Sequence, residues 1–208
     1  MYIQLHSDDT YWRHIRENRN FLWDDTHFCP PETLTIEEAV YFRVHPLELT
    51  ARPDINPLTE DQHESDPLLV NGVWTQTWLT TVLDESAASA KRIKATDLKW
   101  GKIKIERDSR KNGGTFVSNK WFHSDSDSRI QQLGLVLMGA NVPAVQWKTM
   151  DGSFITMSQA LAGGIFQATA TLDMQLFEVA ENHRTAMEAS ERPDLYDFSA
   201  GWPARYSE

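Results

Sequence analysis

The feature that most constrains the fold is a stripe of apolar residues in the last third of the chain. Its members are separated by 4, 3, 4, 4, 3, 4 and 3 positions, and they are Leu161, Ile165, Ala168, Leu172, Leu176, Val179, His183 and Ala186. This near-heptad spacing predicts an amphipathic helix of about thirty residues, roughly 40 Å long. A short hairpin does not cover that length. We therefore expect a second helix to cover the stripe, from this chain or from another copy.

Five residues of the stripe are candidates for contacts between chains, namely Leu161, Ile165, Leu172, Leu176 and Val179. Ser158 is the predicted N-cap of the helix, and Arg192-Pro193 is predicted to stop it. Gly163 and Gly164 lie inside the helix, where each glycine costs ~1 kcal/mol. We expect them to mark a place where another backbone approaches closely.

Three hairpins are predicted from turn residues between alternating runs. Asn71-Gly72 suits a type I′ turn, and Trp74 and Trp78 then share one face of the second strand. These two tryptophans are interpreted either as half of a small core or as a contact surface. Ser118-Asn119 is the expected tip of the second hairpin, and Asp151-Gly152 is the expected two-residue turn of the third.

The remaining elements follow from periodicity and capping. Strands are expected at 2–5 and 42–49, with Pro46 confining the second to an edge or a bend. Helices are expected at 7–18 and after the capping-box pair Thr35/Glu38. One linking helix or two are expected from about 85 to 110, with Gly101 as the place of a bend or break. Residues 51–67 are predicted as a loop or an extended arm. A helix near 126–141, ended by Asn141 and Pro143, is expected to turn Ile130, Leu133 and Leu137 inward.

These elements together predict an α+β protein. A small N-terminal domain rich in β-hairpins is expected over residues 1–85. A linking helix, further hairpins and the long amphipathic helix are expected to form a second domain over 86–192. Residues 193–208 are then a C-terminal tail.

Composition excludes several classes of protein. The formal net charge of −10 disfavours binding to duplex nucleic acid or to a membrane surface. Cys29 is the only cysteine, so no disulfide forms within the chain. No apolar run approaches the ~18 residues that a membrane span requires. The one basic cluster, from Lys91 to Lys111, is interpreted as a solvated helix face or an interface with an acidic neighbour.

No motif for catalysis emerges. His27 and Cys29 offer one imidazole and one thiol, which is too few for a zinc site. The oxygens of His123–Ser128 lack the glycine and the distal glutamate of a calcium loop, and N-capping of the following helix explains them better. We therefore predict no catalytic, cofactor-binding or metal-binding residue.

Several stretches of the chain resemble a known family. The segments IERDSRKNGGTFVSNKWFHSDSDS and VQWKTMDGSFITMS, followed by the long helix, resemble a phage-associated family, domain of unknown function 4376. The region before it resembles the segment that precedes this domain in phage tail-associated proteins, at Pro67, Asn71, Gly72, Trp74, Gln76, Trp78 and Asp84-Glu85. The first forty residues match no such pattern.

The resemblance implies a place in the virion tail and implies no catalytic activity. It suggests a structural protein of the virion tail, at the baseplate or the tail-fibre junction, which associates with other tail proteins and with copies of itself. A tail-fibre assembly chaperone that leaves before the virion matures is the alternative. An enzyme, for example a glycan-active one, is the third and least supported class.

Overall fold

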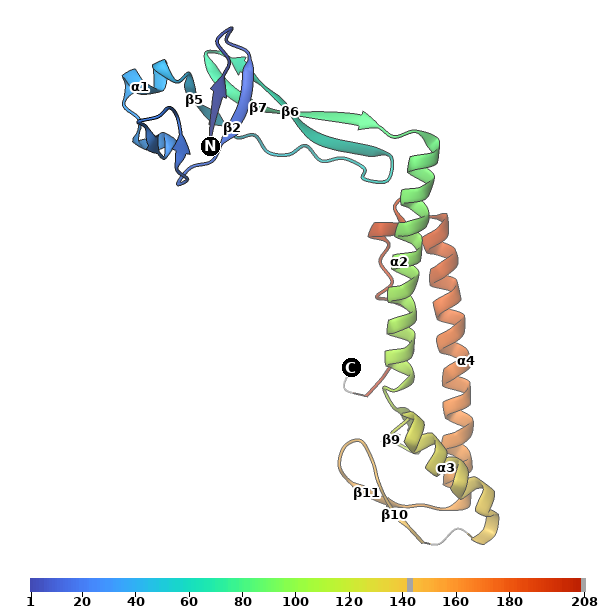
Figure 1. Ribbon diagram of the computed structural model, residues 1–208. Coiled ribbons are helices and arrows are strands. Elements are labelled where there is room, and N and C mark those ends of the chain that lie inside the picture. Colours follow the sequence, from blue (N-terminus) through green and yellow to red (C-terminus); the bar gives the residue numbers. More distant parts are fainter. Residues whose placement is uncertain (142–143, 207–208) are drawn as a thin grey trace. The chain divides into compact units, whose positions relative to one another are not determined.

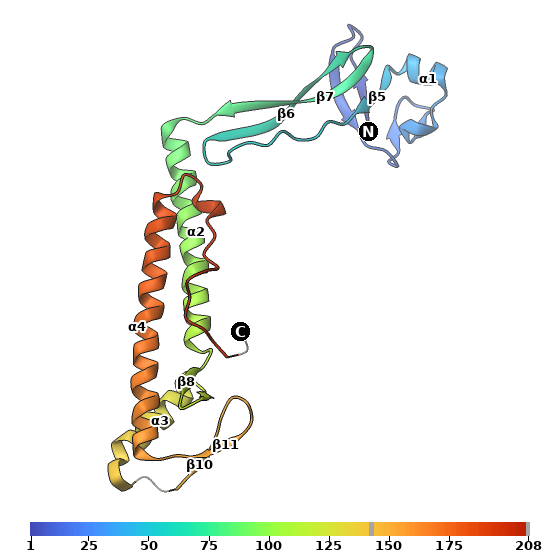
Figure 2. The ribbon, with the colours of Figure 1, turned by 180° about the vertical axis from the view of Figure 1, so that it is seen from behind.

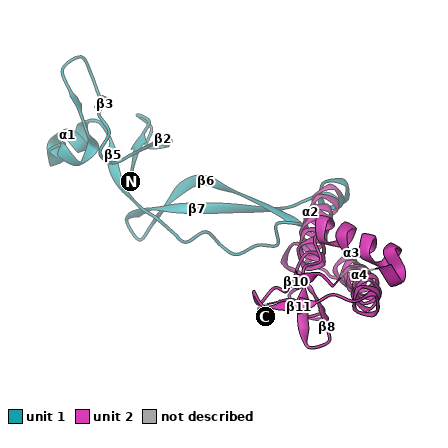
Figure 3. Ribbon diagram, turned by 90° about the horizontal axis from the view of Figure 1, so that it is seen from below, with its two compact units in different colours: residues 1–89 teal, residues 90–208 magenta. Residues whose placement is uncertain are grey.

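The computed structural model describes residues 1–141 and 144–206 of the chain. The predicted α+β class is confirmed. The chain forms two compact units, Met1–Ser89 and Ala90–Glu208, which Figure 3 shows in different colours. Pro143, predicted to end a helix, and residues 207–208 of the predicted tail lie outside the described residues.

The N-terminal unit is built mainly from short strands. Its elements are β1 (Tyr2–Leu5), β2 (Tyr11–Ile15), β3 (Phe21–Leu22), β4 (Phe28–Cys29), the 3₁₀ turn η1 (Pro31–Thr33), α1 (Ile36–Tyr41), β5 (Val44–Glu48), β6 (Glu60–Val70) and β7 (Val73–Val82). The five-stranded sheet has the order β2-β1-β5-β7-β6. Its ladders are antiparallel except that between β5 and β7.

Two predictions for this unit concern proline and the capping box. Thr35 and Glu38 form the predicted capping box at the start of α1. The strand around Pro46 is also confirmed, but β5 lies inside the sheet rather than at its edge. Pro46 pairs only with Tyr2 of β1, and the ladder with β7 begins one residue later, at Leu47. The missing N–H of Pro46 therefore interrupts no bond to β7.

Two other predictions for this unit were wrong, one of them only in part. The expected helix at 7–18 is replaced by strand β2, because Asp9 adopts a positive φ and turns the chain back along β1. The loop or extended arm expected at 51–67 is confirmed over 51–59, but from Glu60 onward the chain is strand β6, paired with β7. Pro67 lies at a bulge between Ser65 and Leu68, where its lack of an N–H is tolerated.

The C-terminal unit contains the long helices. The elements that complete the chain are α2 (Glu85–Lys111), β8 (Thr115–Val117), β9 (Lys120–Phe122), α3 (Ser126–Met138), the 3₁₀ turn η2 (Gly139–Asn141), β10 (Gln146–Lys148), β11 (Phe154–Thr156), α4 (Gln159–Ala189) and the 3₁₀ turn η3 (Pro193–Leu195). Helix α2 runs unbroken through Gly101. Figures 1 and 2 show α2 and α4 side by side, running in opposite directions.

The long C-terminal helix is confirmed as one continuous element. Ser158 caps it, accepting a hydrogen bond from the backbone N–H of Leu161 at 3.2 Å. At its start the helix packs on a core of Phe122, Met157, Ala162 and Ile165, all at most 2% exposed. The hairpins in front of the helix supply two of these residues and thereby anchor its N-terminal end.

The third hairpin differs in detail from its prediction. The N–H of Gly152 donates to the Thr149 carbonyl, and the N–H of Thr149 donates to the Ser153 carbonyl, both at 2.9 Å. This is a three-residue loop with its glycine at positive φ, not the expected two-residue turn. The Asp151 side chain decides the geometry, because it accepts from Thr149, Ser153 and Lys120. The tip at Ser118-Asn119 is confirmed, with positive φ at both residues.

The orientation predicted for α3 was wrong. Ile130, Leu133 and Leu137 are 68%, 39% and 77% exposed instead of facing inward. Gln132 is buried in their place, and its amide donates to the His123 carbonyl at 2.8 Å. Arg129 reaches Asp173 on α4 from the same helix. These polar anchors set the rotation of α3, and they leave its apolar stripe outside.

Candidate association surfaces

The buried face of α4 is close to the predicted stripe but not identical with it. Its buried residues are Ala162, Ile165, Thr169, Leu176, Ala180 and Met187. Ile165 and Leu176 belong to both sets. At the other four positions the buried residue directly follows a stripe residue, as Ala162 follows Leu161 and Ala180 follows Val179. The helix is thus turned slightly from the rotation that the pattern alone predicts.

This rotation separates the candidate interface residues into two groups. Ile165 and Leu176 are 0% and 1% exposed, so they pack inside the chain's own core. Leu161, Leu172 and Val179 are half-buried and lie along the margin of that core. Only this second group keeps apolar surface that a second chain reaches without rearrangement.

An open groove of about 620 Å³ runs along the same margin of α4. Gly164, Ala168 and Leu172 line it from the helix, and Phe116 and Trp121 line it from the β8–β9 hairpin. The side chains of Gln167, Thr171 and Gln175 supply its polar groups. Its described lining residues carry no charge, and Phe116 is 53% exposed. The groove therefore suits the apolar surface of another protein segment.

The glycine pair in α4 does not act as predicted within this chain. A Cβ at Gly163 would meet nothing within 4 Å, and one at Gly164 would make an ordinary contact of 3.8 Å with Val117. No backbone of the described residues approaches the pair closely. Because Gly164 lines the groove, the space above it is open to an outside partner.

Cations of α2 hold the far end of α4. The Arg92 guanidinium donates to the carbonyls of Glu188, Ser190 and Glu191 at 2.9, 2.7 and 3.2 Å. These carbonyls lie at the C-terminal end of α4, where the helix dipole favours a positive charge. Lower on α2, the Arg107 guanidinium lies 4.6 Å from the Phe177 ring centroid. Helix α4 therefore has an intrachain partner, α2, along its C-terminal half.

Arg129 joins three segments near the C-terminal end of α2. Its guanidinium donates to both carboxylate oxygens of Asp173, at 2.6 and 3.1 Å, and to the Lys111 carbonyl at 2.9 Å. It also donates to the Ser124 carbonyl. The end of α2, the start of α3 and the middle of α4 thus meet at one side chain.

Comparison with known proteins gives one match. The family model described as "Domain of unknown function (DUF4376)" matches residues 92–200, which is more than half of the chain. The chain belongs to this family. Neither the curated proteins nor the solved structures contain a significant match to it.

The DUF4376 segment contains most of α2, all of α3 and α4, and the described groove lining except Ala204. The chain at its C-terminal end is bound to the helix pair. His183 Nδ1 lies 2.9 Å from the Tyr196 hydroxyl, and its Nε2 lies 2.9 Å from the Ala200 carbonyl. Lys99 donates to the Tyr196 carbonyl at 2.8 Å, and Arg110 donates to the Pro203 carbonyl at 3.0 Å. The predicted tail is therefore ordered over its described residues and packs on α2 and α4.

Outside the DUF4376 segment, the two candidate tryptophans have different environments. Trp74 packs against the core of Ile3, Leu5 and Leu47. The Trp78 indole N–H donates to Thr50 Oγ1 at 3.2 Å, and the Arg52 guanidinium lies 5.5 Å from its ring centroid. Both rings are half-buried. Trp74 thus serves the core, while Trp78 is held by polar and cationic neighbours.

The residues considered for metal binding have other roles. His27 Nδ1 lies 2.9 Å from Asp24, and its Nε2 lies 3.2 Å from Glu38 of α1. Asp125 is the N-cap of α3 and accepts from the Ser128 backbone N–H, which lowers the pKa of its carboxyl group. Over residues 1–141 and 144–206, no three His, Cys, Asp or Glu side chains group in a way that could hold a metal ion. None of the helices in these ranges has the uncharged apolar run that spanning a lipid bilayer requires.

The contacts of His27 predict its titration. The hydrogen bond to Asp24, together with the charges of Asp24 and Glu38, raises the pKa of His27. At pH values below the pKa of an unfolded histidine, these contacts stabilise the folded protein in full. The stabilisation is lost as the pH rises through the higher pKa that His27 has in the folded protein. We expect Asp24→Asn to lower the pKa of His27, as measured by NMR titration of its ring protons. An unchanged value would show that Asp24 is not its partner, and Asp25→Asn serves as the matched control.

Proposed function

We propose that this protein is a non-catalytic structural component of a bacteriophage tail, at the baseplate or the tail-fibre junction, that acts by protein–protein association. The sequence resemblance to tail-associated proteins supports the setting. The observation that supports action by association is the apolar surface that α2 and α4 leave exposed. Leu98, Ile105, Met174 and Phe177 there are 50–70% exposed, and the groove beside Leu172 is open. Large apolar side chains left exposed on one helix pair support an interaction site there.

Under this proposal the partners are other tail proteins and further copies of the chain, and neither nucleic acid nor membrane is bound. Copies associate through the groove margin of α4, where Leu161, Leu172 and Val179 keep part of their surface. Ile165 and Leu176 hold the helix in place from inside. The neutral groove lining places no charge in such an interface, so no charge loses its hydration when the interface forms.

Mass spectrometry of purified virions tests the setting. We expect the chain in mature particles, in a fixed copy number relative to the other tail proteins. If particles form only in its presence but do not contain it, the chain is an assembly chaperone and the structural role is wrong.

Leu172→Asp tests the association surface. We expect the variant to sediment as a smaller species than the wild-type chain, because a carboxylate in an apolar interface loses its hydration without gaining a partner. The thermal midpoint should change little, since Leu172 is only half-buried in the single chain. Gln167→Asp, at the polar side of the same groove, is the milder control. A Leu172→Asp variant that sediments like the wild-type chain excludes this surface from the interface.

A further inference from the structure

A second surface lies on the outward side of α2. Lys94, Leu98, Lys102 and Ile105 are spaced by 4, 4 and 3 residues, so they share one face of the helix. Leu98 is 62% exposed and Ile105 is 70% exposed. Both lysines are exposed, and neither has an acidic partner among the described residues. This face combines apolar area with two lysines that form no ion pair among the described residues.

The other cations of α2 are used within the chain. Arg92 and Lys99 donate to carbonyls of the C-terminal segment, and Arg107 contacts Asp108 and Phe177. Lys104 lies over the Trp100 ring, and Lys111 pairs with Asp173. Lys91 and Arg110 also have partners. The basic cluster is therefore mainly structural, with Lys94 and Lys102 as its outward exceptions.

Charge is distributed unequally along the chain. Residues 1–89 hold sixteen acidic residues, five arginines and no lysine, whereas residues 90–208 hold fourteen acidic and fifteen basic residues. The negative charge of the protein thus belongs to the N-terminal unit. A basic surface on α2 and an acidic unit in the same sequence are electrostatically complementary when two copies meet.

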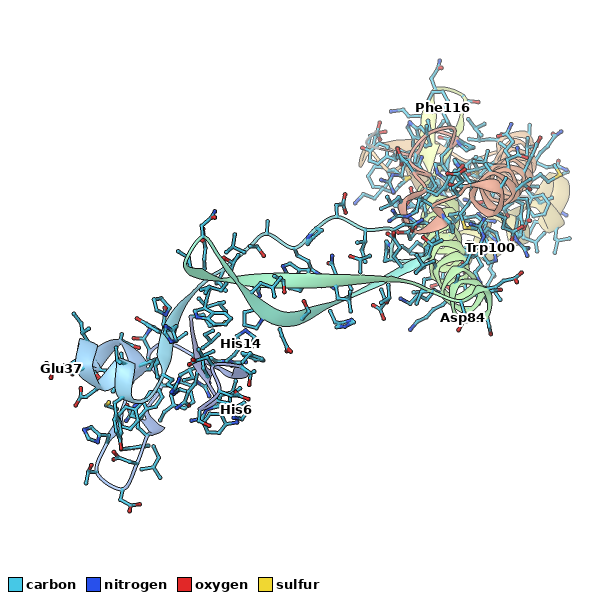
Figure 4. All side chains as sticks on the ribbon, turned by 90° about the horizontal axis from the view of Figure 1, so that it is seen from above. His6, His14, Glu37, Asp84, Trp100 and Phe116 are labelled. Carbon is cyan, nitrogen blue, oxygen red and sulfur yellow. The ribbon has the colours of Figure 1, made fainter. Side chains whose placement is uncertain are left out.

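Helix α1 provides an apolar face inside the acidic unit. None of its residues is buried, and Ile36, Val40 and Tyr41 are 85%, 70% and 77% exposed. Glu37 is exposed on the same helix without an ion pair among the described residues, and Figure 4 shows it at the outer edge of the unit. Glu38, in contrast, is held by Thr35 and His27.

We propose that the outward face of α2 binds helix α1 of a second copy. Leu98 and Ile105 cover the exposed apolar side chains of α1, and Lys94 or Lys102 pairs with Glu37. The apolar pair Leu98 and Ile105 spans ~11 Å along α2 and α1 is ~9 Å long, so the apolar stretches of the two helices are similar in length. Pairing α1 with α1 would bring two copies of Glu37 together, and pairing α2 with α2 would bring lysines together. The contact therefore joins α2 of one copy to α1 of the next, head to tail.

Charge exchange on the full chain tests this contact. All variants carry Leu172→Asp, so that the groove interface proposed above does not contribute. We expect this parent to associate reversibly in sedimentation at low salt and less at high salt. Lys94→Glu/Lys102→Glu should weaken association about tenfold, as should Glu37→Lys. Combining all three changes in one chain should restore it, because every pair is opposite in charge again.

Lys148→Glu, at an exposed lysine of β10, is the matched control and should leave association unchanged. Cross-linking a mixture of ¹⁴N- and ¹⁵N-labelled parent chains gives a second readout that needs no change to α1. It should yield mixed-isotope links from Lys94 or Lys102 to Glu37.

The proposal is overturned if the parent does not associate, if the triple exchange fails to restore association, or if those links occur only within one isotope. Its failure leaves the tail proposal intact, since virion composition tests that separately.

Discussion

Replacing Leu176 by Asp is expected to destabilise the C-terminal unit strongly. Leu176 is 1% exposed in the middle of α4, so the new carboxylate would be buried without a partner. The lost apolar contacts and the buried charge together cost about 4 kcal/mol or more. For a unit of this size that lowers the thermal midpoint by roughly 15 °C or more. Circular dichroism at 222 nm during heating measures the change, because α2 and α4 dominate that signal.

Leu172→Asp is the matched control for this experiment. It places the same carboxylate on the same helix, four residues earlier, at a half-buried position beside the groove. We expect it to change association and leave the midpoint nearly unchanged, whereas Leu176→Asp changes the midpoint first. Equal midpoints for the two variants would contradict the described rotation of α4.

Arg129→Ala is expected to cause the second largest loss of stability. The change removes the donor to Asp173 and to the carbonyls of Lys111 and Ser124 at once. Asp173, whose side chain is 24% exposed, then keeps a 3.7 Å contact with Lys111 as its one ion pair among the described residues. Hydrogen bonds to charged groups and the cost of an unpaired carboxylate together suggest about 2–3 kcal/mol. Chemical denaturation followed by helix signal measures it.

Two further variants separate the charge of Arg129 from its shape. Arg129→Lys keeps the charge but not the forked geometry, so we expect it to recover only part of the loss. Asp173→Asn in the Arg129→Ala background should reduce the defect, because it removes the unpaired charge. If Arg129→Ala alone is as stable as the wild-type protein, the three-segment junction is not a stabilising feature.

The sequence predicted elements well where local chemistry decides them. The N-cap at Ser158, the capping box at Thr35 and the Asn71-Gly72 turn each depend on neighbouring residues and were confirmed. The prediction of a helix over 7–18 was wrong because the alternation of Tyr11, Arg13 and Ile15 is equally compatible with a strand. Pairing with β1 decided between them, and that pairing is a tertiary contact.

The candidate surfaces were only partly predictable. The stripe on α4 identified the right helix, but the rotation that buries Ile165 and Leu176 while leaving Leu172 at a groove comes from packing against α2 and α3. For α2, the sequence indicated that the basic cluster is a solvated face or an interface, but not which of its lysines face outward. The signal was present in the sequence, since the first lysine of the chain is Lys91 and all earlier cations are arginines or histidines. Only the contacts of Arg92, Lys99 and Arg107 show which lysines remain outside.

The sequence by itself determined that a helix as long as α4 exists, where it begins and ends, and that it needs a cover, because caps and apolar spacing act over a few neighbouring residues. Tertiary structure alone decided which faces stay exposed. Polar anchors such as the buried Gln132 and the half-buried Arg129 must each reach a partner, so few helix rotations satisfy them. They therefore set the rotation of helices whose apolar residues alone would fit several. The surfaces left for association follow from those anchors.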